Sequence, residues 1–552
     1  MPDPFVLGNL VSHLAETARI SPDQTAIISE QTKQYSSRSF RELYLDVIRC
    51  EAHLKRKGIS KENKVLLFIS PGYELTVVAF AIIRLGAVPV IIDPGMGLKA
   101  VLNSIRSTRP DALIAIPLVY WASYGFRKTF KTVNIRILLT SSSFQDQWLG
   151  YEVADPTPET PTNADDLAAI VFTSGSTGSP KGVRYLHKNF NAQIKSLKEN
   201  FHIEHGEVDL ATLPIFSLFN PALGVTTVVP AMNPRKPAQA CPEKLVNSIL
   251  AYSVSSAFAS PVIGKKLSDY CSAKKMVLPS MKRIFLAGAP SPPKLIENLD
   301  KILVSGTVYI PYGATEALPV SFTTASEIQR KKPSILSGEG SLLGKATKDI
   351  IIKIFPPFPQ IPINPNSNQN QELSRCEVGE ICVSGDIVTD GYYRKPGASF
   401  DARLEFQNKT YHRMGDLGYF DQEGFLRFLG RKAECLQTQH GPLETERCEP
   451  MINDLPEVQR SALIGLGQKN HQEPCIVVQL KNPNLDQKLK AELKTKIQNL
   501  LNNAFPDFLF KFIVWEDSIP VDARHNAKIH RLSLSRKWTQ SIKKIDGGKV
   551  SG

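Results

Sequence analysis

The chain has 552 residues, of which 42% are hydrophobic and 22% are charged, and its formal net charge is +13 at pH 7. This length exceeds what one hydrophobic core usually supports, so it predicts at least two domains. The basic balance favours anionic partners such as nucleotides, acidic carriers or membrane surfaces. Nucleic acid is not expected as a partner, because the lysines and arginines are dispersed and no nucleic-acid-binding motif occurs.

The cysteines and the N-terminus indicate a soluble, cytoplasmic protein. The eight cysteines form no CxxC pair and no zinc-ligand spacing with histidine, so we interpret them as free thiols in a reducing cytosol. Residues 1–4 lack the basic and apolar regions of a signal peptide. The most apolar stretch, Leu75 to Ile92, contains Arg84, Gly86 and Pro89. It therefore predicts a buried helix, a turn and a strand rather than a transmembrane segment.

Helical spacing and short apolar runs alternate along the chain. This β-α-β order predicts an α/β fold with mostly parallel sheets, and the last part of the chain predicts a small α+β unit. The predicted helices cover 5–20, 39–57, 73–85, 99–108, 187–201 and 485–503, and the predicted strands cover 25–29, 64–69, 88–92, 112–116, 168–172, 380–384, 461–464 and 475–480.

A loop of small and hydroxyl-bearing residues follows the strand that ends at Phe172 and precedes the helix that begins at His187. It reads TSGSTGSPKG over 173–182. Small residues let backbone N–H groups approach an anion closely, the hydroxyls add donors, and the lysine adds charge. The loop lacks the GKS or GKT of a Walker A motif, and a flexible turn is the alternative. It predicts a triphosphate site made by Thr173, Ser174, Gly175, Ser176, Thr177, Gly178 and Lys181.

With this loop the sequence resembles the adenylate-forming superfamily of acyl-CoA synthetases, peptide-synthetase adenylation domains and luciferases. Further motifs of that superfamily follow in order along essentially the whole chain. The resemblance implies a large N-terminal domain, 1–430, of two α/β subdomains plus a distorted β-barrel. A small mobile α+β lid, 431–552, would follow a hinge near 431–434. The motifs are GAVP with IDP at 86–94, LAGAP at 286–290, YGATE at 312–316, GEI to GY at 379–392, HRMGD at 412–416 and GR at 430–431.

The resemblance also implies ATP and Mg²⁺ as cofactors and assigns roles to individual residues. Glu316 would hold Mg²⁺, because a hard cation takes carboxylate and phosphate oxygens together. Thr315 would bond the α-phosphate, and Asp416 would accept both ribose hydroxyls with Arg431 in support. Taken alone, each residue has another explanation, such as a turn cap, a core residue or a helix cap. The adenine side would be formed by Gly288, Ala289, Tyr312, Gly313 and Ala314.

The family places an essential lysine near the C-terminus, and Lys528 is the candidate here. A cation at this point would neutralise carboxylate and phosphate charge in the transition state. The alternative is one basic residue in a basic tail. His187 and His525 are candidate bases for a substrate hydroxyl, but for His187 a packing or phosphate-orienting role at a helix start is the favoured interpretation. The predicted catalytic set is thus Lys528, Thr315, Glu316, Lys181 and His187.

Departures from the common pattern resemble one subgroup, the β-lactone synthetases of bacterial long-chain olefin biosynthesis. Ser217 stands where acyl-CoA synthetases usually have the histidine of P-x-F-H, and the subgroup's motifs occur at 218–224, 312–320 and 524–529. The resemblance implies a 2-alkyl-3-hydroxy fatty acid as substrate. Its carboxylate would be adenylated, and its own 3-hydroxyl would then displace AMP to close a β-lactone. Other olefin-pathway enzymes would be partners.

Three alternatives stay open at this point. In an acyl-CoA synthetase, CoA would take the acyl group. An adenylation module would load a carrier protein supplied by a separate chain. A catalytically inactive scaffold is the third alternative, and the intact motifs argue against it.

Overall fold

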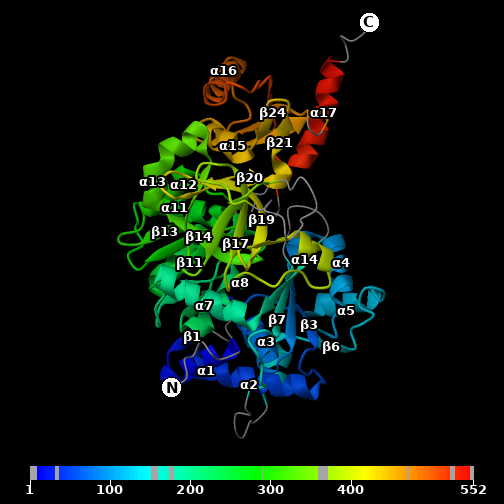
Figure 1. Cartoon of the computed structure of the whole chain (residues 1–552). Helices are drawn as coiled ribbons and strands as arrows, with labels where there is room; N and C mark the ends of the chain where they lie inside the picture. The colour runs from blue at the N-terminus through cyan, green and yellow to red at the C-terminus, as the bar shows by residue number, and fades with distance from the viewer. Residues whose placement is uncertain are drawn as a thin grey trace.

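The computed structural model describes residues 9–31, 37–150, 159–172, 180–288, 290–357, 371–468, 471–521 and 529–546. In Figure 1 the chain begins at the bottom of the view, and its C-terminal helices and strands lie at the top. Within these ranges, no helix has the length and apolar character needed to cross a membrane. The predicted α/β architecture, with a large N-terminal part and a small C-terminal part, is confirmed.

The first unit is a six-stranded sheet in the order β6-β5-β3-β4-β7-β8. Its strands are parallel except β8, which runs antiparallel to β7. Helices connect the strands, as apolar runs separated by helical spacing predict. The elements are β3 (Lys64–Phe68), α3 (Tyr73–Arg84), β4 (Val88–Ile92), α4 (Leu98–Thr108), β5 (Ala112–Ala115), α5 (Pro117–Gly125), β6 (Ile135–Leu138), β7 (Leu167–Phe172) and β8 (Gly182–Leu186).

Strand β8 was not predicted: the sequence placed the loop at 173–182 after a strand and before a helix, and no element was assigned to 183–186. β8 pairs antiparallel with β7, with Phe172 opposite Gly182, and α7 (His187–Phe201) begins only after β8. Gly182 is required at this pairing, because a Cβ there would lie 2.6 Å from the Phe172 ring. The sequence pattern of the five residues of β8 is weaker than the helical periodicity of α7, which follows directly, so β8 was not predicted.

The second unit is a 14-stranded sheet whose order along the main path is β16-β17-β19-β20-β15-β14-β13-β12-β11-β9-β10-β1-β2, with β18 on β19. It is parallel from β1 to β13, apart from the edge strand β2, and antiparallel from β13 onward. Its strands are β1 (Thr25–Ser29), β2 (Ser37–Ser39), β9 (Val208–Leu210), β10 (Thr226–Val229), β11 (Ser256–Ala259), β12 (Arg283–Leu286), β13 (Thr307–Ala314), β14 (Ala317–Thr324), β15 (Ser341–Ala346), β16 (Ile351–Phe355), β17 (Gly379–Ser384), β18 (Arg403–Phe406), β19 (Lys409–Phe420) and β20 (Leu426–Arg431).

Helices flank the 14-stranded sheet, and one hydrophobic core contains residues of these helices and of both large sheets. The start of α2 shows how sequence sets a boundary: Ser39 and Glu42 form a reciprocal capping box. The other helices are α1 (Val11–Ile20), α2 (Phe40–Arg56), α8 (Pro214–Ser217), α9 (Asn220–Leu223), α10 (Pro242–Ala251), α11 (Pro261–Lys274), α12 (Pro293–Asp300), α13 (Ala325–Ser334) with its continuation η5 (Ile335–Glu339), and α14 (Pro396–Asp401).

The C-terminal part has hydrophobic cores of its own on both faces of a three-stranded sheet. Alternate residues of β24 divide between them: Ile476 and Val478 pack with α15 and α16, whereas Cys475 and Val477 pack with α17. A strand buried on both faces explains the continuous apolar run at 475–478. The elements are β21 (Leu436–Thr438), β22 (Gly441–Leu443), α15 (Thr445–Asn453), β23 (Val458–Leu466), β24 (Glu473–Leu480), α16 (Gln487–Ala504), β25 (Phe512–Trp515) and α17 (Arg531–Asp546).

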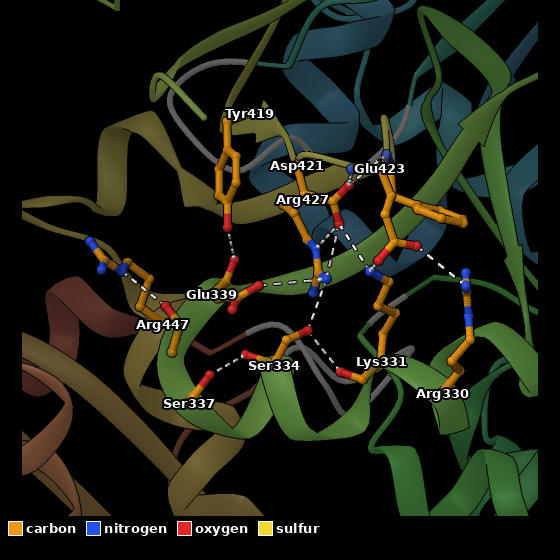
Figure 2. A network of polar contacts seen from close by, with 12 residues as sticks. Arg330, Lys331, Ser334, Ser337, Glu339, Tyr419, Asp421, Glu423, Arg427 and Arg447 are labelled. Carbon is orange, nitrogen blue, oxygen red and sulfur yellow. Dashed lines mark hydrogen bonds and ion pairs between the residues drawn. The ribbon is translucent and has the colours of Figure 1, made fainter. Parts of the chain in front are cut away.

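A polar network fastens the turn between β19 and β20 to α13 and η5 (Figure 2). Arg427 is fully buried; its Nε lies 3.1 Å from Asp421 Oδ2, and its Nη2 donates to Ser334 Oγ at 2.8 Å. Tyr419 donates to the carbonyl of Glu339 at 2.9 Å. From the C-terminal part, Arg447 Nε donates to the carbonyl of Gly338 at 3.0 Å, so η5 joins this network to α15.

We expect Arg427→Met to lower the free energy of unfolding by about 3–5 kcal/mol, because it leaves Asp421 buried without its guanidinium partner. Chemical denaturation followed by circular dichroism measures this. Arg330→Met is the matched control: Arg330 is exposed, and its pair with Glu423 spans 3.3 Å, so the loss should stay below about 1 kcal/mol. Equal losses in the two variants would contradict the structural importance of the buried pair.

Candidate active site

A cavity of about 1470 Å³ connects the two large sheets with the C-terminal part. Its two ends differ in chemistry. One end is polar and lies where β13, β19 and β20 meet the C-terminal residues. The other is apolar and lies between α3, α7 and the segment of α8 and α9. The polar end includes Tyr312, Asp416, Arg431, Glu434 and Arg531, and the apolar end includes Phe80, Ile83, Phe190, Leu197, Phe201 and Phe219.

The carboxylate of Asp416 is the most buried charge of the polar end. Tyr312 donates its hydroxyl to Asp416 Oδ2 at 2.6 Å, and Arg431 Nη1 lies 2.8 Å from Asp416 Oδ1. Asp416 and Arg431 are direct partners in the β19–β20 register. Burial raises the pKa of Asp416, although Arg431 and the Tyr312 hydrogen bond act to lower it. A paired carboxylate that faces a cavity can accept hydroxyl groups of a bound sugar.

The turn between β13 and β14 carries Thr315 and Glu316. Gly313 makes the turn feasible, because a Cβ at that position would lie 2.5 Å from the carbonyl oxygen of Ala317. The β13–β14 register shifts between Tyr312 and Ala314, which is the local irregularity expected of a β-bulge. The structure thus turns Tyr312, Gly313, Ala314 and Thr315 toward the same cavity.

Two tyrosines hold this turn in place, and sequence reasoning assigned no role to either. Tyr392 donates to Glu316 Oε1 at 2.7 Å, and Tyr185 of β8 donates to the carbonyl of Thr315 at 2.5 Å. Lys181 lies over the Tyr392 ring, with Nζ 4.7 Å from the ring centroid. Burial and the nearby Glu316 raise the pKa of Tyr392, so its phenol stays a donor. This chain of contacts brings the end of the phosphate loop next to the predicted metal-binding carboxylate.

The metal prediction can be compared with the donor set. Among the described residues no group of three or more His, Cys, Asp or Glu side chains could hold a metal ion by itself. A single carboxylate suits Mg²⁺, which keeps several waters and takes further oxygens from substrate phosphates. Glu316 therefore fits a cation that arrives with a nucleotide.

Several predicted residues lie outside the described ranges: Thr173 to Gly178 of the phosphate loop, Ala289, His525 and Lys528. Their roles stay predictions. Gly288, next to Ala289, lines the cavity with a φ of +94°, a left-handed conformation that favours glycine.

His187 does not line the cavity. It begins α7, it is buried, and its Nδ1 has no hydrogen-bond partner among the described residues. Burial lowers the pKa of His187 to about 4, against an opposing influence from Asp166. The structure therefore brings Thr315, Glu316 and Lys181 together but leaves His187 apart, as a buried residue at the helix start.

Gln193 is a cavity residue that sequence reasoning missed. It lies on α7, is 5% exposed, and donates from Nε2 to the carbonyl of Leu318 at 2.9 Å. Its Oε1 accepts no hydrogen bond from the described residues. A buried amide oxygen without a donor is costly, and a ligand hydroxyl would satisfy it. The one sequence signal for Gln193 is its helical spacing, which places it on the same face of α7 as the cavity residues Phe190 and Leu197.

The Ser217 departure has a structural counterpart. Ser217 Oγ donates to the carbonyl of Pro214 at 2.8 Å, within its own short helix α8, and does not line the large cavity. Its neighbour Phe216 does, and it stacks on Phe258 with centroids 4.6 Å apart. The position that usually supplies an imidazole to the acyl site therefore supplies neither a base nor a free hydroxyl here.

The family model described as AMP-binding enzyme matches residues 14–393. The chain belongs to the AMP-binding enzyme family. It is 34% identical to proteins named olefin beta-lactone synthetase from Stenotrophomonas maltophilia and Xanthomonas campestris, with 96% of this chain and 97% of each relative covered. A solved structure of ATP-bound MatB from Rhodopseudomonas palustris has the same fold, with a TM-score of 0.78, 20% identity, and coverage of 97% of this chain and 99% of that one.

As a member of this family the chain is an adenylate-forming ligase. Such an enzyme takes its adenylyl group from ATP. The cavity geometry agrees with that chemistry, since a buried carboxylate and a glycine-containing turn line one space. Lys181 lies over the ring of Tyr392, which donates to Glu316 of the same turn.

Because His187 is held neutral by burial, we expect the His187→Gln variant to keep its adenylation rate within a few-fold of the parent. Its stability profile should change. Below pH 6.5 the unfolded chain protonates this histidine while the folded chain does not, so folding loses up to about 3 kcal/mol as pH falls from 6.5 to 4. In denaturant titrations at several pH values, the free energy of unfolding of the variant should therefore fall less steeply between pH 6.5 and 4 than that of the parent. A large loss of adenylation with an unchanged slope would restore His187 as a catalytic base.

Proposed function

We propose that this ligase uses ATP to activate a 2-alkyl-3-hydroxy fatty acid and then closes it to a β-lactone. The observation that carries the proposal is the 34% identity, over nearly full length, to relatives named olefin beta-lactone synthetase. The apolar end of the cavity supports it, because a long hydrocarbon chain gains about 25 cal/mol for each Å² of surface that it buries.

We propose that the nucleotide occupies the polar end. Asp416 would accept the ribose hydroxyls with Arg431 beside it, and adenine would lie against Tyr312, with Gly288, Ala289, Gly313 and Ala314 nearby. Glu316 would hold Mg²⁺, which neutralises phosphate charge when bound. Thr315, Lys181 and the phosphate loop 173–178 would orient the phosphates. Lys528 would come from the C-terminal part, 431–552, acting as a lid with its hinge near 431–434.

In the first step one carboxylate oxygen of the acid attacks the α-phosphorus of ATP, and pyrophosphate leaves with the electron pair of the broken P–O bond. The protein positions the carboxylate in line with that bond, and cationic side chains offset the charge that accumulates. The products of this step are an acyl-adenylate and pyrophosphate.

In the second step the 3-hydroxyl oxygen attacks the activated acyl carbon, the acyl–phosphate C–O bond breaks, and AMP leaves. The hydroxyl proton is lost to solvent or to a base. The nucleophile belongs to the same molecule, so its effective concentration is high. We propose that Gln193 orients the 3-hydroxyl through its unpaired Oε1, which would accept a hydrogen bond from that hydroxyl. No CoA is required, and a decarboxylating olefin-pathway enzyme would consume the lactone.

The test is mass spectrometry of products formed from ATP, Mg²⁺ and a 2-alkyl-3-hydroxy fatty acid, with and without CoA. We expect the substrate mass minus one water, formed equally well without CoA. A CoA thioester, with no product when CoA is omitted, would instead identify an acyl-CoA synthetase.

The variant Gln193→Leu should lower lactone yield about tenfold or more, while pyrophosphate release from the matching acid without the hydroxyl stays near the parent rate.

The proposed ribose site predicts a pH effect. The ionised form of Asp416 accepts hydroxyls, and Arg431 lowers the pKa of that carboxyl. Arg431→Met should therefore raise the pKa further, so that AMP binding is lost at a higher pH than in the parent. Arg431→Lys, which keeps the charge, should shift the profile less. Calorimetric titration of AMP between pH 5 and 9 measures this. If AMP affinity falls at the same pH in the parent and the Met variant, the assignment of Asp416 to the ribose is contradicted.

A further inference from the structure

Helix α5 exposes large apolar side chains that a surface helix normally turns toward the core. Its sequence is PLVYWASYG, yet Ser123 is its only buried residue. Leu118 is 78% exposed, Trp121 65% and Tyr124 45%. A surface helix normally turns its apolar stripe to the core and its polar residues to water. Here Leu118, Trp121 and Tyr124 face solvent, whereas Val119 and Tyr120 are half-buried and pack against the core.

The exposed Trp121 and Tyr124 form an aromatic cluster with the half-buried Tyr120. Tyr120 packs edge-on against Trp121, with centroids 5.2 Å apart, and against Tyr124 at 5.7 Å. Phe126, immediately after the helix, is also exposed, as is Leu98 at the start of α4. We call Leu98, Leu118, Trp121, Tyr124 and Phe126 the α5 surface. Large exposed side chains that contact one another, as Trp121 and Tyr124 do, are typical of an interaction site.

Basic residues surround the α5 surface. Between Pro94 and Gln145 the only acidic residue is Asp111, and it is paired with Lys64 at 2.7 Å. Arg106 Nε donates to Thr129 Oγ1 at 3.0 Å, which ties α4 to the segment after α5, and Figure 1 shows both helices on one side of the molecule. The exposed basic residues here, none of which forms an ion pair among the described residues, are Lys99, Arg106, Arg109, Arg127, Lys128 and Lys131.

We propose that the α5 surface docks on an anionic lipid bilayer. Tryptophan and tyrosine with an apolar body and a polar edge settle at the headgroup level of a membrane, and nearby lysines and arginines attract acidic headgroups. The helix would lie in the interface plane, since nine residues at about 1.5 Å each cannot cross a hydrocarbon core about 30 Å thick. This inference does not rest on the proposed β-lactone product.

Charge argues against a second copy of this chain as the occupant. A twofold contact through the α5 surface would set the same basic residues against each other, because symmetric dimers bury the same patch on both subunits. Like charges across an interface are strongly unfavourable. An anionic bilayer, in contrast, complements both the aromatic cluster and the basic residues around it.

The experiment is co-sedimentation of the full chain with large unilamellar vesicles. Pure phosphatidylcholine vesicles are compared with vesicles that also contain phosphatidylglycerol. We expect binding to the anionic vesicles that weakens with added salt, and little binding to the neutral ones. Replacing Arg127, Lys128 and Lys131 together by Glu should lower the partition coefficient at least about tenfold. The double variant Leu118→Ser with Trp121→Ser should also release the protein.

A matched control separates the α5 surface from the overall positive charge. Lys488, Lys494 and Lys496 are exposed on α16, and replacing them by Glu makes the same change in net charge far along the chain. This variant should bind anionic vesicles as the parent does. Equal loss in both triple variants, or a parent that stays in the supernatant with anionic vesicles, would overturn the proposal. Concentration-dependent dimers that the Trp121 variant abolishes would assign the surface to self-association instead.

Discussion

The burial of the Asp416 carboxylate is the constraint on which the rest of the site depends. A buried carboxylate costs several kcal/mol unless charge and hydrogen bonds compensate it. Here the compensation comes from Tyr312 on β13 and Arg431 at the end of β20, so three strands are fixed to one another at this point. The turn that carries Thr315 and Glu316 follows Tyr312 directly. The position of this turn thus follows from the pairing at Asp416.

The same pairing lies where the chain leaves β20 for the C-terminal elements. Arg431 ends β20, and the next residues continue in ion pairs: Lys432 lies 3.0 Å from Glu380, and Glu434 lies 2.6 Å from Arg531 of α17. Because this part has its own hydrophobic cores, its attachment near the cavity rests on polar contacts such as these. Polar contacts can be exchanged without exposing a core, which agrees with a lid that changes position.

Much of the fold was predictable because buried parallel strands and amphipathic helices leave strong periodic signals. Strands β1 and β4 and helix α7 have the predicted bounds. Strand β8 was missed, since five residues between a glycine-rich loop and a helix carry too short a pattern to register.

The residues of the candidate site also fall into those that the sequence could predict and those that it could not. Tyr312, Thr315, Glu316, Asp416 and Arg431 lie in contiguous motifs, so a family resemblance could locate them. The structure places Tyr312, Thr315, Asp416 and Arg431 around one cavity, with Glu316 next to Thr315 in the turn. Tyr185 and Gln193 contribute because of the face that β8 and α7 turn toward the β13–β14 turn, which no local pattern encodes. The roles of the phosphate loop and Lys528 stay predictions.

The placement of the α5 surface is compatible with the lid motion proposed for the C-terminal part. Helix α5 follows β5, which pairs with β3, and β3 pairs with β4. Residues of α3 and β4, including Phe80, Ile83 and Ile91, line the apolar end of the cavity. The lipid-facing surface and the acyl end of the cavity therefore belong to one sheet and its helices, whereas the C-terminal part is built on another sheet. A bilayer held at α5 would keep a hydrophobic substrate near the unit that receives its chains and would leave the C-terminal part free to move.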